Sequence, residues 1–149
     1  MTARPLSQSD FSVNFEAKPE WVAMVRRGVE TLLGAGADGR LVGDVKAGVT
    51  EACMNAVRHA YPDQSGRVEV EAWLEPERLT VSVRDFGQGL ASSEPGGPGL
   101  GMPLMEALSS WVEISSEPGD GTEVVLQFDL PGGGHGHASE PARLMALTA

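Results

Sequence analysis

The chain has 149 residues and a formal net charge of −10, so one domain with an ordinary core is expected. The acidic balance argues against non-specific binding to DNA, RNA or anionic lipid, but it leaves room for a phosphorylated small ligand held by backbone amides and a metal ion. No apolar run approaches a membrane span, and the first residues lack the basic start and apolar stretch of a signal peptide. The single cysteine, Cys53, excludes an internal disulfide and a cysteine metal site, which fits a reducing cytoplasm; we interpret Cys53 as buried packing without a catalytic role.

The first part of the chain predicts a strand followed by a helix. Residues 1–10 are polar and are expected to be flexible. Apolar and polar residues alternate at 11–16, which predicts a half-buried strand. Pro19 suits the first turn of a helix that glycines at 34 and 36 would end. Arg26 and Arg27 lie mostly off the apolar face of this helix, and two interpretations stay open: solvated charges, or a docking point for an acidic or polar partner.

A second helix is expected from about Asp38 to Tyr61, where Pro62 stops it. Its buried stripe consists of small and β-branched residues, namely Val42, Val45, Val49, Ala52 and Ala56. Glu51 and Asn55 are four positions apart, so both lie on one helix face, one turn from each other. Polar groups presented together from an otherwise packed helix indicate a ligand.

Two hairpins and a glycine-rich segment follow. Alternating runs at 68–73 and 79–85 predict the first hairpin, and runs from 111 and at 122–130 predict the second. Between them stand Asp85-Phe86-Gly87-Gln88-Gly89, a flexible segment, and Gly99-Leu100-Gly101-Met102, which leads into a helix at 103–110. Glycine lets backbone N–H groups approach a ligand, and such amides at a helix N-terminus bind anions. The alternative for each cluster is a mobile surface loop.

The last part, residues 131–149, is expected to be a flexible tail because it contains a linker-like glycine and histidine tract. His135 and His137 would make a poor closed metal site, since two exposed histidines supply too few ligands. The segment from Arg143 to Leu147 is interpreted as a helical turn or as disordered.

The element order predicts an α+β fold: a two-layer α/β sandwich with a mixed, mostly antiparallel sheet and helices on one face. It is not the alternating βαβ order of a Rossmann domain, and no strand leads into a Walker A sequence.

Four motifs together resemble the nucleotide-binding boxes of the Bergerat ATP-binding fold, which histidine kinases, gyrase and MutL share. They are Glu51-x-x-x-Asn55, Asp85-x-Gly87-x-Gly89, Gly99-Leu100-Gly101 and Gly121-Thr122. The compact size and the sequence motif Glu-Ala-x-x-Asn-Ala-x-x-His-Ala-Tyr are most similar to those of the anti-sigma-factor serine/threonine kinases of bacterial partner switching. The resemblance covers residues 11–130, which are expected to form one histidine-kinase-like ATP-binding domain.

The resemblance implies ATP or ADP with Mg²⁺ as the ligand. Asn55 would bind Mg²⁺ through its side-chain oxygen, and Asp85 would accept a hydrogen bond from the adenine amino group. Thr122 would support this adenine contact of Asp85 directly or through water. Gly87 and Gly89 would let the backbone lie close to the adenine base.

The same resemblance assigns the phosphate end and the chemistry. The lid over the phosphates would include Gly97, Gly99, Leu100, Gly101 and Met102. Arg58 and His59 would approach the phosphates, although His59 is equally well explained as a structural hydrogen-bonding residue. Glu51 would be the general base for a serine or threonine hydroxyl of a protein substrate; its alternative is a solvated helix carboxylate.

The function implied is a cytoplasmic kinase, expected to be a homodimer, that sequesters a sigma factor and phosphorylates a small anti-anti-sigma antagonist without binding nucleic acid or membrane. One departure from the family pattern is a short lid between Gly89 and Gly99 that contains no Arg or Lys. A non-catalytic module that binds its partner in an ATP- or ADP-dependent way therefore stays as the alternative. A histidine-kinase catalytic domain is disfavoured, since no phosphoacceptor helix pair precedes residue 11.

Overall fold

The computed structural model describes residues 4–62, 65–89, 102–131 and 144–148. The elements, in chain order, are strand β1 (Phe11–Glu16), a 3₁₀ turn η1 (Pro19–Trp21), helices α1 (Val22–Leu33) and α2 (Gly39–Asn55), a π-helical turn η2 (Ala56–Ala60), strands β2 (Arg67–Leu74) and β3 (Arg78–Asp85), helix α3 (Met102–Leu108), and strands β4 (Trp111–Glu117), β5 (Gly121–Asp129) and β6 (Leu144–Thr148).

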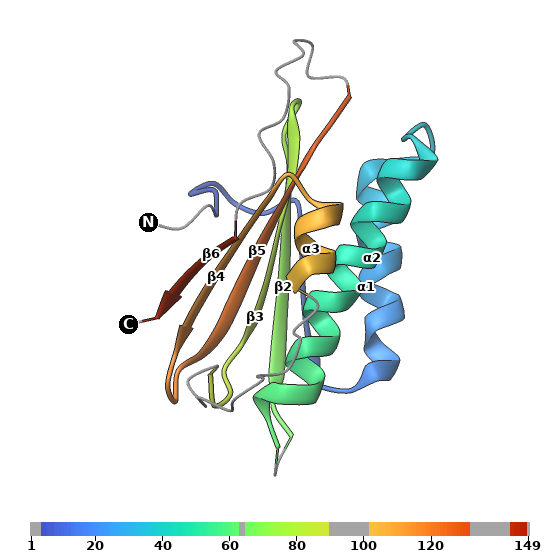
Figure 1. The fold of residues 1–149 in the computed structure, drawn as a ribbon. Coiled ribbons are helices and arrows are strands. Elements are labelled where there is room, and N and C mark those ends of the chain that lie inside the picture. Colours follow the sequence, from blue (N-terminus) through green and yellow to red (C-terminus); the bar gives the residue numbers. More distant parts are fainter. Residues whose placement is uncertain (1–3, 63–64, 90–101, 132–143, 149) are drawn as a thin grey trace.

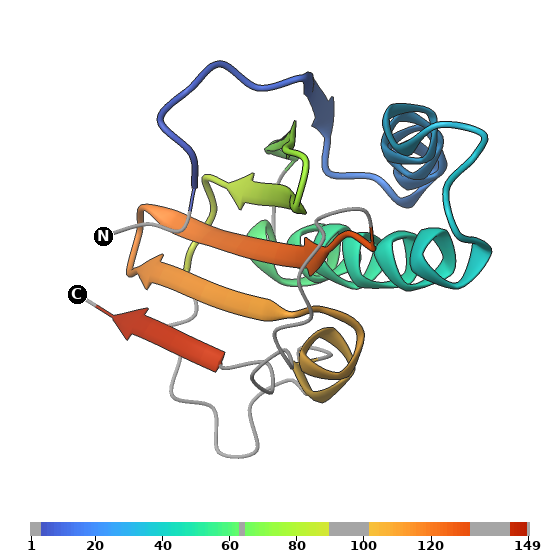
Figure 2. The same ribbon diagram turned by 90° about the horizontal axis from the view of Figure 1, so that it is seen from above.

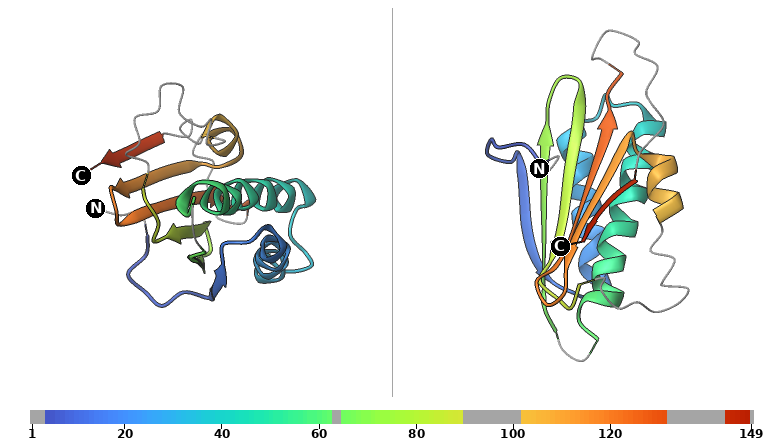
Figure 3. Two further views of the ribbon diagram at one scale, coloured as in Figure 1. Left: turned by 90° about the horizontal axis from the view of Figure 1, so that it is seen from below. Right: turned by 60° about the vertical axis from the view of Figure 1, so that its left-hand side comes forward.

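The strands form one sheet in the order β1-β2-β3-β5-β4-β6 (Figure 1). Neighbouring strands are antiparallel, except that β6 runs parallel to β4. Helix α1 covers β1 and β2, helix α2 covers β3 and β5, and helix α3 lies beside β4 (Figure 2). All three helices lie on one face of the sheet in each view (Figure 3). The predicted two-layer α+β sandwich with a mixed sheet is confirmed.

The core lies between these two layers. Its largest fully buried side chains include Val25 and Val29 of α1, Val45 and Val49 of α2, and Phe128 of β5. Burying each such side chain contributes roughly 1.5–3 kcal/mol. The period of 3.6 in the helices and of 2 in the strands brings these residues to the shared interface, as the sequence pattern predicts.

Helix α2 has a capped start and continues at its end into a turn of different geometry. The Asp38 side chain caps it by accepting the backbone N–H of Arg40 at 3.0 Å. The predicted helix over 38–61 is not α-helical throughout, because its last turn, Ala56–Ala60, is a π-turn. A π-turn is wider than an α-turn and is frequently found at functional sites.

Described residues near both ends of the chain make specific contacts with the sheet. Residues of the segment 4–10 contact the outer face of the sheet: the Arg4 guanidinium pairs with Glu71 at 2.9 Å and with Glu123 at 3.1 Å, and the Trp73 indole N–H donates to the carbonyl of Ser7. The interpretation of Arg143–Leu147 as a helical turn or disordered is wrong for residues 144–147, because they belong to strand β6 (Leu144–Thr148). Strand β6 is short, lies at the edge of the sheet and is stabilised by its pairing with β4. The local sequence pattern does not reveal this pairing. His135 and His137 lie outside the described residues.

None of the helices in the described ranges is long and apolar enough to cross a membrane.

Candidate functional site

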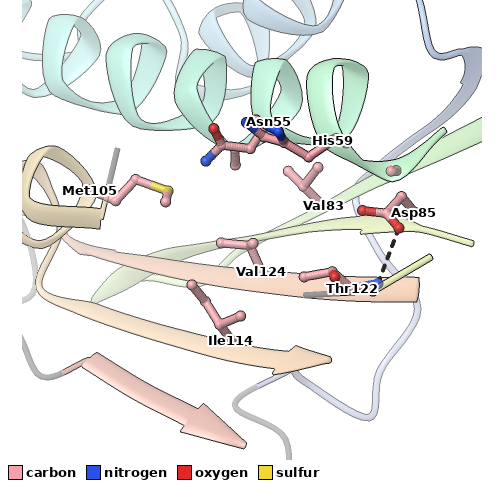
Figure 4. Close-up of a pocket in the computed structure, with 12 residues that line it drawn as sticks. Asn55, His59, Val83, Asp85, Met105, Ile114, Thr122 and Val124 are labelled. Carbon is pink, nitrogen blue, oxygen red and sulfur yellow. Dashed lines mark hydrogen bonds between the residues drawn. The ribbon is translucent and has the colours of Figure 1, made fainter. Parts of the chain in front are cut away.

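A pocket lies between the end of α2 and the sheet, with α3 at one side (Figure 4). The helical wall consists of Ala52, Asn55, Ala56, His59 and Ala60. The strands supply Val83, Asp85, Ile114, Thr122 and Val124, the loop after β3 supplies Gly89, and α3 supplies Met105.

The pocket is mostly apolar, and the sequence explains why space remains there. Small side chains at Ala52, Ala56 and Ala60 keep the helix from filling the gap above the sheet. Val83 and Val124 face it from neighbouring strands, since alternate residues of a strand point to one face. An apolar cleft with a few polar groups at its edge is typical of a small-molecule site and suits the flat face of a heterocyclic base.

Among the described lining residues, Asp85 carries the carboxylate, and it lies at one end of the pocket (Figure 4). It is the last residue of β3 and is 6% exposed. Its Oδ1 accepts the backbone N–H of Gly87 at 3.0 Å and that of Thr122 at 3.1 Å. Burial raises the pKa of Asp85 above its usual value, while the two amide donors oppose that shift because they stabilise the carboxylate.

Thr122 reaches Asp85 through its backbone, not through its side chain. Its hydroxyl instead pairs with the hydroxyl of Ser116 on β4, at 2.9 Å. Gly121 allows this close approach: its φ of 92° is in the left-handed region, and a Cβ there would clash with the Asp85 carbonyl. The hairpin β4–β5 is thereby held against the end of β3.

Asn55 and His59 are the polar residues of the helical wall. Asn55 is the last residue of α2, and His59 follows in the π-turn; both are half-buried and line the pocket (Figure 4). Glu51 is half-buried one turn before Asn55, and Arg58 is exposed; neither lines the pocket.

The structure therefore brings together only part of the predicted set. Asn55, His59, Asp85, Gly89 and Thr122 share the pocket, and Gly87 touches it through its hydrogen bond to Asp85. Met102 begins α3 and is half-buried outside the pocket lining. Arg26 and Arg27 lie on α1, half-buried and exposed respectively, and are not part of the pocket. The predicted lid residues Gly97, Gly99, Leu100 and Gly101 lie outside the described residues.

The charges around the pocket bear on metal binding. Within the described ranges, no group of three or more His, Cys, Asp and Glu side chains could hold a metal ion by itself. The described lining also contains no Lys or Arg. A metal at this site would thus need further ligands, and the phosphates of a bound nucleotide together with water would supply them.

Sequence reasoning missed the apolar part of the pocket. Val83, Met105, Ile114 and Val124 line it, yet each reads as an ordinary core residue. The strand pattern assigns three of them to the helix-facing side of the sheet, but a pattern does not tell a filled interface from one with a gap.

The part of the chain that resembles known proteins includes the whole described pocket lining. A family model, the histidine kinase-like ATPase domain, matches residues 15–128, a range that contains every lining residue. The anti-sigma F factor of Clostridium beijerinckii is 29% identical over 137 residues, which cover 82% of this chain and 95% of that protein. The serine-protein kinase RsbW of Bacillus velezensis is 36% identical over 123 residues, covering 69% of this chain and 76% of that protein. RsbW of Bacillus subtilis is 33% identical with the same coverage.

Proposed function

The chain belongs to the histidine kinase-like ATPase domain family, and from this we propose that it is an ATP-dependent protein serine/threonine kinase that acts as an anti-sigma factor. In this function it sequesters a sigma factor and phosphorylates a small anti-anti-sigma antagonist. The observation that carries the proposal is that Asn55 and Asp85, from two predicted motifs, face the same apolar pocket (Figure 4).

The base end of the site favours adenine. The Asp85 carboxylate has one oxygen engaged by two backbone amides, and it is available to accept a hydrogen bond from an exocyclic amino group. Adenine carries that amino group, whereas guanine places a carbonyl at the equivalent position, so the carboxylate would face another acceptor and gain no hydrogen bond from the base. The apolar side chains of Val83 and Val124 suit the face of the ring.

Mg²⁺ is proposed to enter together with the nucleotide. A hard cation prefers oxygen ligands and commonly uses one or two protein groups beside substrate phosphates, which matches the side-chain oxygen of Asn55 at the pocket wall. When bound, the ion neutralises charge on the phosphates; the described lining has no basic side chain for that purpose. Arg58 and His59 of the π-turn would assist, Arg58 from its exposed position and His59 from the wall.

Glu51 is proposed as the general base. It precedes Asn55 by one helical turn, is half-buried, and is adjacent in sequence to Ala52 of the pocket lining. The substrate hydroxyl oxygen attacks the γ-phosphorus, the bond from that phosphorus to the bridging oxygen breaks, and ADP leaves. Glu51 orients the hydroxyl and takes its proton.

The partners are proposed from the names of the relatives, which include anti-sigma F factors and serine-protein kinases. Arg26 and Arg27 of α1 form the proposed docking point for an acidic or polar partner surface. A homodimer in the cytoplasm, acting on protein partners and not on nucleic acid or membrane, completes the proposal.

Two observations keep the non-catalytic binding module as the second candidate. Glu51 does not line the pocket, and the segment between Gly89 and Gly99 contains no Arg or Lys to stabilise a transferring phosphoryl group. Nucleotide binding needs neither group, whereas transfer depends on such groups.

The test uses the full chain with radiolabelled ATP, a sigma factor and an antagonist-type domain from the same genome. The proposal expects label on a serine or threonine of the antagonist and nucleotide-dependent binding of the sigma factor. Binding of ATP and of the sigma factor without any transfer favours the binding module. If ATP does not bind, the site assignment is wrong.

A further inference from the structure

We infer that Tyr61 and Gln88 are positioning residues that clamp the loop of residues 85–89 against the end of the Asn55 helix. The clamp sets the spacing between the adenine end and the phosphate end of the site. The inference rests on the proposed nucleotide site, and neither residue is assigned a role by the motifs.

Tyr61 supplies the first contact of the clamp. It directly follows the π-turn, and its hydroxyl donates to the carbonyl of Arg67 at 2.6 Å and accepts the backbone N–H of Phe86 at 2.8 Å. Its ring lies against Gly66, where a Cβ would clash. Since Phe86 is next to Asp85, one hydroxyl ties the helix end to the start of β2 and to the residue beside the proposed adenine-binding carboxylate.

Gln88 supplies the second contact. Its backbone N–H donates to the carbonyl of Ala60 at 3.0 Å, and its side-chain amide donates to the carbonyl of His59 at 2.8 Å. Its own carbonyl accepts the N–H of Gly119 from the β4–β5 turn at 3.0 Å. Carbonyls at the end of a helix lack partners within the helix, so Gln88 caps the π-turn although its side chain is exposed.

The packing between these two contacts leaves little freedom. Gly87 lies against the last carbonyl of the π-turn, that of Ala60, and a Cβ at Gly87 would clash with it. Asn55 is the last residue of α2 and leads directly into this turn. The clamp therefore joins the segment that carries Asn55 to the loop that carries Asp85.

A fixed spacing has different consequences for different ligands. A nucleotide with Mg²⁺ that contacts both Asp85 and Asn55 binds best when the two groups are already held at the correct separation, because less ordering accompanies binding. Adenosine, which reaches only the Asp85 end, gains nothing from that separation. Removing the clamp is therefore expected to lower the affinity for the nucleotide with Mg²⁺ more than the affinity for adenosine.

The experiment measures the affinity of adenosine and of Mg-ADP for the full chain by calorimetry. Tyr61→Phe removes only the hydroxyl, and Gln88→Met keeps the length of the side chain but removes its donor. Each variant is expected to weaken Mg-ADP binding on the order of three- to tenfold, the net value of about one hydrogen bond, and the double variant more. Adenosine affinity is expected to change less than about twofold, because the contact to Asp85 persists.

The matched control is Ser110→Ala. The Ser110 hydroxyl accepts the backbone N–H of Asp129 at 2.9 Å, and neither residue lines the pocket. This variant is expected to lower thermal stability without changing the ratio of the two affinities. If Tyr61→Phe and Gln88→Met weaken both ligands equally, or neither, their role is only structural and the inference is overturned.

A ligand-free measurement separates this inference from the proposed function. Tyr61→Phe is expected to accelerate amide hydrogen exchange at Phe86, because that N–H loses its acceptor. Unchanged exchange at Phe86 overturns the clamp even if nucleotides bind. Failure of the wild-type chain to bind either ligand, with accelerated exchange in the variant, contradicts the nucleotide site while the clamp stands.

Discussion

The carboxylate of Asp85 accepts the backbone amide of Thr122 at 3.1 Å, although the two residues are 37 positions apart in the chain. This hydrogen bond joins the end of β3 to the start of β5 and orients the carboxylate at one end of the pocket. Because a backbone amide is the donor, any residue at position 122 other than proline retains the bond. The side chain of Thr122 is left to pair with Ser116.

The first prediction concerns the choice of base. The wild-type chain is expected to bind Mg-ATP and Mg-ADP far more tightly than the guanine nucleotides, since guanine offers no amino group to the buried Asp85 carboxylate and places a carbonyl there. Losing such a charged hydrogen bond costs on the order of 2–3 kcal/mol, which is roughly 30- to 150-fold in affinity. Asp85→Asn is expected to reduce this discrimination, as measured by calorimetry with both nucleotides. Equal affinity of the wild type for ATP and GTP contradicts the pocket assignment.

The second prediction concerns stability and pH in the ligand-free protein. Burial raises the pKa of Asp85 in the folded state above that of the unfolded chain, so ionised Asp85 lowers the free energy of unfolding above the raised pKa. This penalty disappears as the pH falls through the folded pKa towards the ordinary value. Asp85→Asn, which keeps an oxygen acceptor for Gly87 and Thr122, is expected to melt at a higher temperature than the wild type at neutral pH.

The measurement for this pH dependence is the melting temperature of both proteins from neutral to mildly acidic pH. The difference between them is expected to shrink as the pH decreases. Asp129→Asn is a matched control, since Asp129 is exposed on β5 and outside the pocket. A difference that does not vary with pH shows that ionisation of Asp85 is not its cause.

The third prediction concerns the metal. Asn55→Ala is expected to weaken Mg-ATP binding by about tenfold or more and to reduce phosphoryl transfer to background, because the oxygen ligand for Mg²⁺ is removed. Binding of ADP without metal is expected to change little. Thr50→Ala serves as a control on the same helix, where the hydroxyl only donates to the carbonyl of Lys46. Normal Mg-ATP binding and transfer by Asn55→Ala rule out a metal-binding role.

The fourth prediction concerns the general base. Glu51→Gln keeps the shape of the side chain and removes its ability to take a proton. Transfer to the antagonist is expected to fall by roughly two to four orders of magnitude, the usual contribution of a positioned base, while nucleotide and sigma-factor binding survive. Transfer assays and calorimetry on the same preparations check this. Equal transfer rates for wild type and variant mean that another group acts as the base.

The fifth prediction concerns the docking point on α1. Arg27 is exposed, so Arg27→Ala is expected to weaken binding of an acidic partner severalfold, mainly by slowing association, without changing nucleotide affinity. Arg40→Ala is the matched control, because Arg40 is also an exposed arginine and lies at the start of α2. Surface plasmon resonance at two salt concentrations measures both. Equal effects of the two variants indicate only a change in net charge.

Much of the fold follows from local patterns. The strands at 11–16, 67–74 and 78–85 and the helix at 22–33 were each predictable, since period 2 and period 3.6 mark a half-buried strand and an amphipathic helix. The segment 144–148 was not predictable as a strand, because its only paired neighbour among the described residues is β4, which is distant in sequence.

The candidate site divides in the same way. By itself the sequence determined which motifs are present: Glu51 and Asn55 at helical spacing, and Asp85 at the end of a strand, because these depend on neighbours within one element. Only the tertiary structure decided that Asn55 and Asp85 share a pocket and that Glu51 stands outside its lining. It also decided that the Tyr61 hydroxyl accepts the N–H of Phe86 and that the Gln88 side chain donates to the carbonyl of His59. Such hydrogen bonds form only where the folded chain brings two segments that are distant in sequence together.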